Sequence, residues 1–438
     1  MTEASSREYG RGAAVLSVGI GTTGLITYAY FSLSSYSLSE ADYGGITLLW
    51  SAVFITVSVL YRPVEQLLSR TIADRDARGE RGREHLRVAA TFQLALGLLF
   101  AVAALAFRGP LEDDLFGGSE TLYWVLIVTV LAYAASYFAR GFLAGHHRFG
   151  LYGLLVLMEA SSRCVFALAV AVGIAEGQSA VALGMAAAPL VSLAVVPWAI
   201  GRRLGRPEPV VETAPLDAAA AGEPAAPGDA QFTLSRGAGF AVAVLLVMLA
   251  EQTFLNAGPL LVMAGEGGAE GAALAGFTFN VLLIARAPLQ LFQSVQTAIL
   301  PVLTRLRASG ETDPFRRSVN LTLVAIAGFA AVVALVMLAA GPDLMDLVFG
   351  GEFDYDRGGL VLIAIGMGLY LSAATLNQAA LARGKASSAA VCWVTAAAAF
   401  VLFLVLVSFD DRVLQVEVGY LGAALVLSGS LYGLYRRG

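Results

Sequence analysis

Long runs of apolar residues recur along the chain, separated by short polar connections. A helix that crosses the hydrocarbon core of a bilayer needs about 20 apolar residues. Because a spanning segment must satisfy its own backbone hydrogen bonds, runs of this length favour helices. A second spanning run comes after the first, so we interpret the first as a retained helix and not as a cleaved signal. The pattern predicts an all-α polytopic membrane protein with twelve transmembrane helices, at about residues 13–36, 44–68, 88–107, 121–145, 151–175, 180–201, 235–263, 272–304, 317–340, 358–382, 388–408 and 414–435.

The charged residues of the connections separate by sign. One set of connections is basic, with Arg70, Arg75, Arg78, Arg81, Arg83, Arg87, Arg148, Arg202, Arg203, Arg206, Arg305, Arg307, Arg316, Arg317, Arg383, Lys385, Arg436 and Arg437. The alternate set is acidic, with Glu40, Asp42, residues 112–114, Glu176, Glu266, Glu270, residues 343–356, Asp410 and Asp411, and it holds only Arg108, Arg357 and Arg412 as basic residues. By the positive-inside rule, both termini and the basic connections are cytoplasmic, and the chain lies in the cell membrane.

Residues 202–232 interrupt the apolar pattern. The stretch is rich in Pro and Ala and has no apolar periodicity, which is typical of a disordered linker. It divides the chain into an N-terminal half, 1–201, and a C-terminal half, 233–438, with six predicted helices each. We interpret it as a passive cytoplasmic tether.

An internal repeat supports the two halves. The outer segment at residues 110–118 resembles the segment at 342–351, and two pairs of cytoplasmic segments also match. The offset is 231 residues for Ala77 and Ala308, 232 for Pro110 and Pro342, and 238 for Leu143 and Leu381. Six helices per repeat give both halves the same orientation. Parallel repeats of this kind place a substrate site between the halves.

Composition agrees with a membrane protein and gives little indication of other partners. Hydrophobic residues make up 58% of the chain and charged residues 14%, against about 25% in soluble domains. The formal charge of −5 gives no nucleic-acid footprint, and no nucleotide-binding motif is present. We expect Cys164 and Cys392 to be buried free thiols. His146 and His147 have no further ligand nearby, so we expect no metal site and no cofactor.

Three stretches carry a resemblance to a known superfamily. They are 139–152 with Glu159 and Arg163, then 286–290 through 300–305, and 349–353 leading to 377–385. In this order they resemble the multidrug/oligosaccharidyl-lipid/polysaccharide exporter superfamily, and most of all its flippases of lipid-linked oligosaccharides. The seventh predicted span, 235–263, departs from the pattern. Asn256-Ala-Gly-Pro259 stands there, where relatives often have Asn followed by an acidic residue. The resemblance implies two six-helix bundles in a V around a central cavity, with lateral gaps for a lipid tail.

Two arginines lie inside predicted spans beside prolines. Arg286 is too deep for easy snorkelling, and a charge at mid-bilayer costs at least about 2.5–3.5 kcal/mol. A guanidinium that faces an aqueous cavity could pair bidentately with a diphosphate; alternatively, it could bind backbone carbonyls or Glu251 and lock the structure. Arg62 is six residues from the cytoplasmic end of its span, where it could bind substrate, snorkel, or be neutralised by Glu65.

Other polar residues in the spans have two interpretations each. Glu251 could carry a proton or be a structural partner of Arg286. Glu159 and Arg163 are spaced i, i+4 on one helix, and we expect them to neutralise each other. Arg140 could contact a gate or a headgroup. A group of amides could bind sugar hydroxyls or form interhelical hydrogen bonds, namely Gln290, Gln293, Asn280, Asn377 and Gln378.

These features favour a membrane transporter that is not an enzyme. The leading hypothesis is a flippase that moves a polyprenyl-diphosphate-linked oligosaccharide to the outer leaflet for cell-surface polysaccharide biosynthesis, with membrane lipids as its other partners. The second hypothesis is an ion-coupled exporter of drugs or metabolites. A membrane-embedded glycosyltransferase or polymerase usually needs a sizeable outer loop or an acidic catalytic motif, and we rank it lower.

Overall fold

The computed structural model describes most of the chain. The described residues are 21–77, 82, 84–146, 148–197, 234–286, 288, 312–350 and 353–437, with the side chains of 74, 76, 77, 234–241 and 312–314 excepted. The predicted linker at 202–232, Gln290, Gln293 and His147 lie outside these residues.

The predicted twelve-helix pattern is confirmed. Among the described residues, eleven stretches are long and apolar enough to cross a membrane, and a further helix at 21–37 covers the described part of the first predicted span. The helices of the N-terminal part are 21–37, α2 Glu40–Leu60, α3 Arg62–Ala77, α4 Glu84–Ala106, α5 Glu120–Gly145, α6 Phe149–Ala171 and α7 Gly177–Ser192, with short turns of π-helix at Pro110–Leu115 and 3-10 helix at Leu193–Val195. Those of the C-terminal part are α9 Leu234–Glu266, Gly268–Arg286, α11 Thr312–Phe349, α12 Arg357–Ala382, α13 Ala386–Leu406 and α14 Arg412–Arg436.

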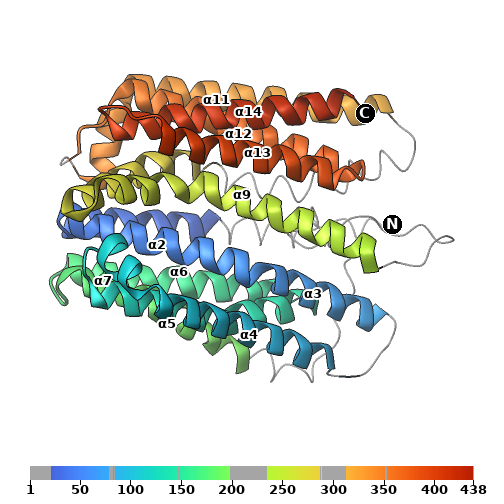
Figure 1. Ribbon diagram of the computed structural model, residues 1–438, viewed down its shortest axis with the longest axis horizontal. Coiled ribbons are helices and arrows are strands. Elements are labelled where there is room, and N and C mark those ends of the chain that lie inside the picture. Colours follow the sequence, from blue (N-terminus) through green and yellow to red (C-terminus); the bar gives the residue numbers. More distant parts are fainter. Residues whose placement is uncertain are drawn as a thin grey trace. The chain divides into compact units, whose positions relative to one another are not determined.

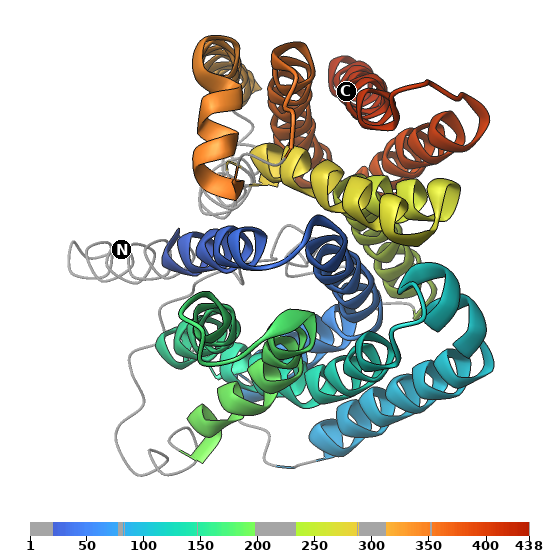
Figure 2. The ribbon, with the colours of Figure 1, turned by 90° about the vertical axis from the view of Figure 1, so that its left-hand side faces the viewer.

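The chain divides into two compact units (Figure 1). The first comprises Met1–Thr213 and Val262–Gly276, and the second comprises Ala214–Leu261 and Phe277–Gly438. In the first unit α5 packs against α2, α3, α4, α6 and α7. In the second, α12 lies between α11 and the pair α13 and α14 (Figure 2). The segment Val262–Gly276, which includes a predicted outer connection, belongs to the first unit. It packs there, where Gly44 of α2 lies so close to the Ala272 backbone that no Cβ would fit.

Two helices expose wide apolar faces. Only 11% of the most apolar window of Phe315–Phe349 is buried, although its mean hydropathy is 2.8, and α4 is similar with 22%. Exposed apolar area on this scale is unstable in water and normal in lipid. These faces therefore contact the bilayer, as the apolar runs predicted.

Some of the acidic residues in the predicted outer connections cap helices. The side chain of Asp356 accepts a hydrogen bond from Gly359 N at 2.8 Å, and that of Asp411 accepts from Val413 N at 2.9 Å. An N-terminal cap satisfies backbone donors that have no partner within the helix. The acidic residues on this side therefore have a structural function in addition to their value as a topology signal.

Two glycines allow α3 and α5 to pack closely. A Cβ on Gly145 would lie 2.7 Å from Ile72 Cβ and 2.9 Å from the Ser69 carbonyl oxygen, and one on Gly141 would lie 2.8 Å from the Glu65 carbonyl oxygen. The spacing i, i+4 puts both glycines on one face of α5, as in small-xxx-small helix pairs of membranes.

We predict that Gly145→Ala destabilises the protein. The added methyl group must displace α3, and overpacking of this kind costs about 1–3 kcal/mol. The matched control is Gly153→Ala on α6, where a Cβ would meet nothing within 4 Å. In the control, alanine should be neutral or stabilising, because it favours helix by about 0.5–1 kcal/mol over glycine. Thermal unfolding in detergent measures both, and equal effects at the two sites would contradict the close packing.

The charge separation predicts the orientation of the spans. Asp113 lies in an acidic connection and Gly82 in a basic one, and both are exposed. In a background without Cys164 and Cys392, a membrane-impermeant maleimide should label Asp113→Cys in right-side-out vesicles. It should label Gly82→Cys only after the vesicles are opened. The reverse pattern would show that the predicted orientation is wrong.

Candidate functional site

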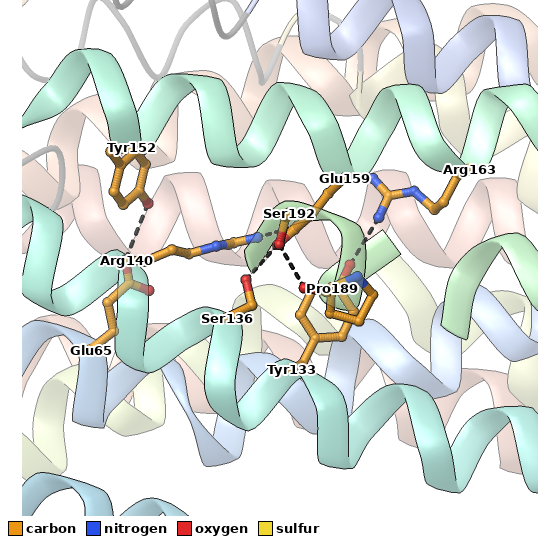
Figure 3. A network of polar contacts seen from close by, with 9 residues as sticks. All are labelled: Glu65, Tyr133, Ser136, Arg140, Tyr152, Glu159, Arg163, Pro189 and Ser192. Carbon is orange, nitrogen blue, oxygen red and sulfur yellow. Dashed lines mark hydrogen bonds and ion pairs between the residues drawn. The ribbon is translucent and has the colours of Figure 1, made fainter. Parts of the chain in front are cut away.

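A buried carboxylate organises the polar contacts of the first unit (Figure 3). Glu159 on α6 is 2% exposed. It forms an ion pair with Arg140 of α5, and it accepts hydrogen bonds from the hydroxyls of Ser136 on α5 and Ser192 at the end of α7, the latter at 3.3 Å. Glu159 therefore connects three helices. Because both charges are buried and supported by further hydrogen bonds, the pair meets the conditions under which a buried ion pair is tolerated.

The prediction that Glu159 and Arg163 pair with each other is wrong. Arg163 instead donates a hydrogen bond to the hydroxyl of Tyr133 at 2.8 Å, and its guanidinium lies over the rings of Trp50 and Phe54, 5.0 and 5.7 Å from their centroids. Spacing along α6 brings the two residues to one face, but α5 offers Glu159 a better partner in Arg140. Sequence spacing describes only contacts within one helix.

A second contact links α3 to α6 near the predicted cytoplasmic end. Glu65 is 8% exposed and accepts a hydrogen bond from the Tyr152 hydroxyl at 3.1 Å. Arg62, the predicted substrate residue, is half-buried where α3 begins. Arg140 lies 4.5 Å from the centroid of the Tyr137 ring in addition to its ion pair with Glu159. These contacts support a structural role for Arg140 in helix packing. Its role at a gate or headgroup stays a prediction.

In the second unit, Arg286 binds helix α9. Its guanidinium nitrogen Nη2 donates to the carbonyl oxygen of Leu255 and, at 3.0 Å, to Oδ1 of Asn256. The guanidinium also lies 4.3 Å from the centroid of the Phe279 ring. Asn256 in turn donates to both oxygens of Gln252, at 3.2 Å each. In this conformation the contact with a backbone carbonyl agrees with the alternative interpretation of Arg286, in which it binds carbonyls and holds helices together. Glu251, the ion-coupling candidate, is half-buried on the same helix.

Two of the three described amides of the predicted group form hydrogen bonds with aromatic side chains. Asn280 is 0% exposed and donates to the Tyr355 hydroxyl at 3.2 Å, and Asn377 is 7% exposed and accepts from the Trp393 ring nitrogen at 3.2 Å. Burial raises the pKa of Tyr355, which lies between the spans. Asn280 therefore connects its helix to the segment before α12, and Asn377 connects α12 to α13.

A buried carboxylate on α14 was not predicted from the sequence. Glu417 is 4% exposed, lies against Gly359 at the start of α12, and forms no hydrogen bond or ion pair with any residue that the structure describes. The nearby acidic residues are Asp356 and Asp411, which cap α12 and α14. The sequence signal that could have identified Glu417 is its position, a few residues inside an apolar span.

Tyr133 and Ser192 were not predicted either. No pattern in the sequence marks these partners, since their role depends on how α5 and α7 pack on α6. His146 has Nδ1 2.8 Å from the carbonyl oxygen of Phe142, and the described residues contain no group of three side chains that could hold a metal ion.

The fold matches solved transporter structures. The chain is similar to an inward-facing multidrug resistance MATE family transporter of the MOP superfamily, with a TM-score of 0.67 and 14% identity, covering 97% of this chain and 98% of the other. It is similar to the eukaryotic MATE transporter AtDTX14, with a TM-score of 0.62, 13% identity and coverage of 100% and 97%. A mutant of the Vibrio cholerae MATE transporter VcmN gives a TM-score of 0.61, 15% identity and coverage of 99% and 98%. No family model and no curated protein sequence matches the chain.

These likenesses confirm the predicted fold class. The chain is an all-α, multi-pass membrane protein with the fold of MATE transporters, which have twelve transmembrane helices in two six-helix bundles. The superfamily expected from the sequence motifs is the one to which the first of these structures belongs.

We predict that Glu159→Gln destabilises the protein by about 3–5 kcal/mol, because it leaves the Arg140 guanidinium buried without its counter-charge. A second change, Arg140→Gln, should recover part of this loss. The matched second change Arg163→Gln should recover none, since Arg163 does not pair with Glu159. Denaturant unfolding in detergent measures the cycle. Greater recovery with Arg163→Gln than with Arg140→Gln would contradict the observed pairing.

Proposed function

We propose that the protein is a transporter that flips a polyprenyl-diphosphate-linked oligosaccharide across the membrane by alternating access. The observation that carries the proposal is the guanidinium of Arg286, the last residue of the described span Gly268–Arg286, which contacts oxygens of Leu255 and Asn256. The apolar run predicted from the sequence continues to residue 304, which would place Arg286 near the middle of its span. A cation at this depth is costly, and such residues commonly mark substrate pathways. A lipid-linked sugar carries a diphosphate that would compensate the charge.

The contacts of Arg286 are of a kind that a substrate can exchange. A carbonyl and an amide oxygen are neutral acceptors, whereas phosphate oxygens form charge-assisted and bidentate hydrogen bonds about twice as strong. In this proposal Arg286 leaves α9 when the diphosphate binds, and Arg62 is a second substrate-binding arginine. Release of the substrate returns Arg286 to Leu255 and Asn256, so the arginine has a partner in both states.

The remaining site residues have supporting roles in the proposal. Asn280 and Asn377 position Tyr355 and Trp393, and Gln290 contacts sugar hydroxyls. Glu251 on α9 is the candidate for ion coupling, because it is an acidic residue on the helix that Arg286 binds.

A second function is an ion-coupled multidrug exporter. It is favoured by the likeness to a structure that is itself described as a multidrug resistance transporter. A cationic drug would need carboxylates in its site, and Glu251 and Glu417 are buried or half-buried carboxylates of the second unit that could supply them. The sign of the substrate charge therefore separates the two functions.

We predict that Arg286→Ala slows flipping of a fluorescent diphosphate-linked oligosaccharide in proteoliposomes by about ten- to a hundredfold. A hydrogen bond to a charged group is worth about 1.5–3 kcal/mol, and each 1.4 kcal/mol is about tenfold in rate. Arg317→Ala is the matched control, because Arg317 is exposed at the start of α11 and its removal takes the same charge from the surface.

Two outcomes would count against the proposal. Equal flipping rates for wild type and Arg286→Ala would remove the role of Arg286. Efflux of cationic dyes by the wild type, without any flipping of the diphosphate lipid, would favour the multidrug exporter.

A further inference from the structure

The first unit contains a guanidinium that no described carboxylate neutralises. Arg163 is 5% exposed, and its side chain binds the Tyr133 hydroxyl and lies over the rings of Trp50 and Phe54. The nearest candidate counter-charge, Glu159, is occupied by Arg140, Ser136 and Ser192. Among the described residues, Arg163 therefore has neutral and aromatic partners only (Figure 3).

The depth of Arg163 excludes snorkelling as its explanation. It lies 14 residues after Phe149 and eight before Ala171, the ends of α6. At 1.5 Å per residue these distances are about 21 and 12 Å, which exceed the reach of an arginine side chain. A cation–π contact contributes about 2 kcal/mol when desolvated, which does not by itself offset the several kcal/mol that burial of an ion costs.

A second, independent observation points to a ligand at this place. Tyr30 is 0% exposed, and its hydroxyl has no hydrogen-bond partner among the described residues. Arg163 is the charged residue that lies close to it. An orphaned buried hydroxyl costs about 1–3 kcal/mol. The ring of Tyr30 lies 6.1 Å from the Trp50 ring, over which the guanidinium of Arg163 lies at 5.0 Å, so both groups are next to the same ring.

The surrounding rings define the shape of the place. The Tyr30 and Trp50 rings have centroids 6.1 Å apart, Trp50 and Phe54 are 4.1 Å apart, and Phe54 and Tyr133 are 6.1 Å apart. Phe54 is partly exposed, so the ring cluster reaches the surface of the structure there. The cluster combines hydrogen-bond donors, the guanidinium of Arg163 and the phenol of Tyr30, with surrounding aromatic rings. The donors could bind a tetrahedral oxyanion, and the rings could pack against an apolar group attached to it.

We propose that Arg163 and the hydroxyl of Tyr30 form an anion-binding site in the first unit that takes a phosphate or diphosphate group. The guanidinium supplies the charge and a bidentate fork, and the phenol donates a further hydrogen bond. The inference rests on the proposed function, since it assigns the diphosphate of the substrate a binding residue that lies deeper in its span than Arg62 does.

Binding of farnesyl diphosphate to the purified full-length protein in detergent tests the site. Farnesol and inorganic diphosphate are the comparison probes. The sharpest variant is Tyr30→Phe, because it removes a hydroxyl that bonds to no described residue and leaves the ring in place. The matched control is Tyr61→Phe, which removes another fully buried hydroxyl without a described hydrogen bond, in the same unit.

We expect Tyr30→Phe to weaken binding of farnesyl diphosphate by about tenfold or more, from the worth of a hydrogen bond to a charged group. Arg163→Gln should weaken it further and Arg163→Lys by less than Gln, because lysine keeps the charge. Tyr61→Phe should leave the Kd unchanged. Tyr30→Phe keeps the test valid even where an Arg163 variant fails to fold, because no described contact of its hydroxyl is lost.

The outcomes separate the inference from the function on which it rests. Equal Kd values for wild type, Tyr30→Phe and Arg163→Gln would overturn the site while leaving the diphosphate transporter intact. No diphosphate binding by the wild type, together with binding of a cationic dye, would overturn both. Binding of farnesyl diphosphate but not of inorganic diphosphate would identify a lipid-linked anion as the ligand, and equal binding of both would identify the free anion.

Discussion

A charge inside a bilayer must be compensated by the protein or by what it carries, and this constraint decides how the interior of the chain is arranged. Glu159 and Arg140 satisfy it by pairing, with two serine hydroxyls as further donors. Arg286 satisfies it with neutral oxygens on α9. Arg163 has only a phenol and aromatic rings among the described residues. The three solutions differ in strength, and the weakest are the ones that a substrate anion can improve.

The constraint on the backbone explains why the fold could be predicted from the sequence. A span must be a continuous apolar helix of known length, so each helix is visible in the sequence as an apolar run of about that length. The largest differences lie at the ends. Helix α11 ends at Phe349, nine residues beyond the predicted end of its span, because it continues through Pro342 into the outer connection. Helix α9 similarly continues to Glu266. Apolar runs identify the part of a helix in lipid and leave its polar extensions unmarked.

The partners of polar residues could not be predicted in the same way. Spacing along α6 suggested that Glu159 pairs with Arg163, but the partner is Arg140, which reaches Glu159 from the neighbouring helix α5. Asn377 and Trp393 meet only because α12 and α13 are neighbours. Glu417 was visible as a charge in a span, yet its burial against Gly359 depends on α12 and α14 packing closely. Contacts between helices are three-dimensional information that one sequence does not carry.

The burial of Arg163 supports the proposal of an anion as cargo. In the first unit the ion pair removes Glu159 from any substrate site, which leaves Arg163 as an excess positive charge. A cationic drug would meet this charge as repulsion, because the one described carboxylate in the interior of α6 is already paired. An anion would gain from the same residue and would also satisfy the Tyr30 hydroxyl. A transporter of cations built on this chain would have to rely on other carboxylates, such as Glu65, Glu251 and Glu417. The burial of Arg163 therefore supports the proposal of a phosphate-bearing substrate through the energetics of burial, independently of the sequence motifs.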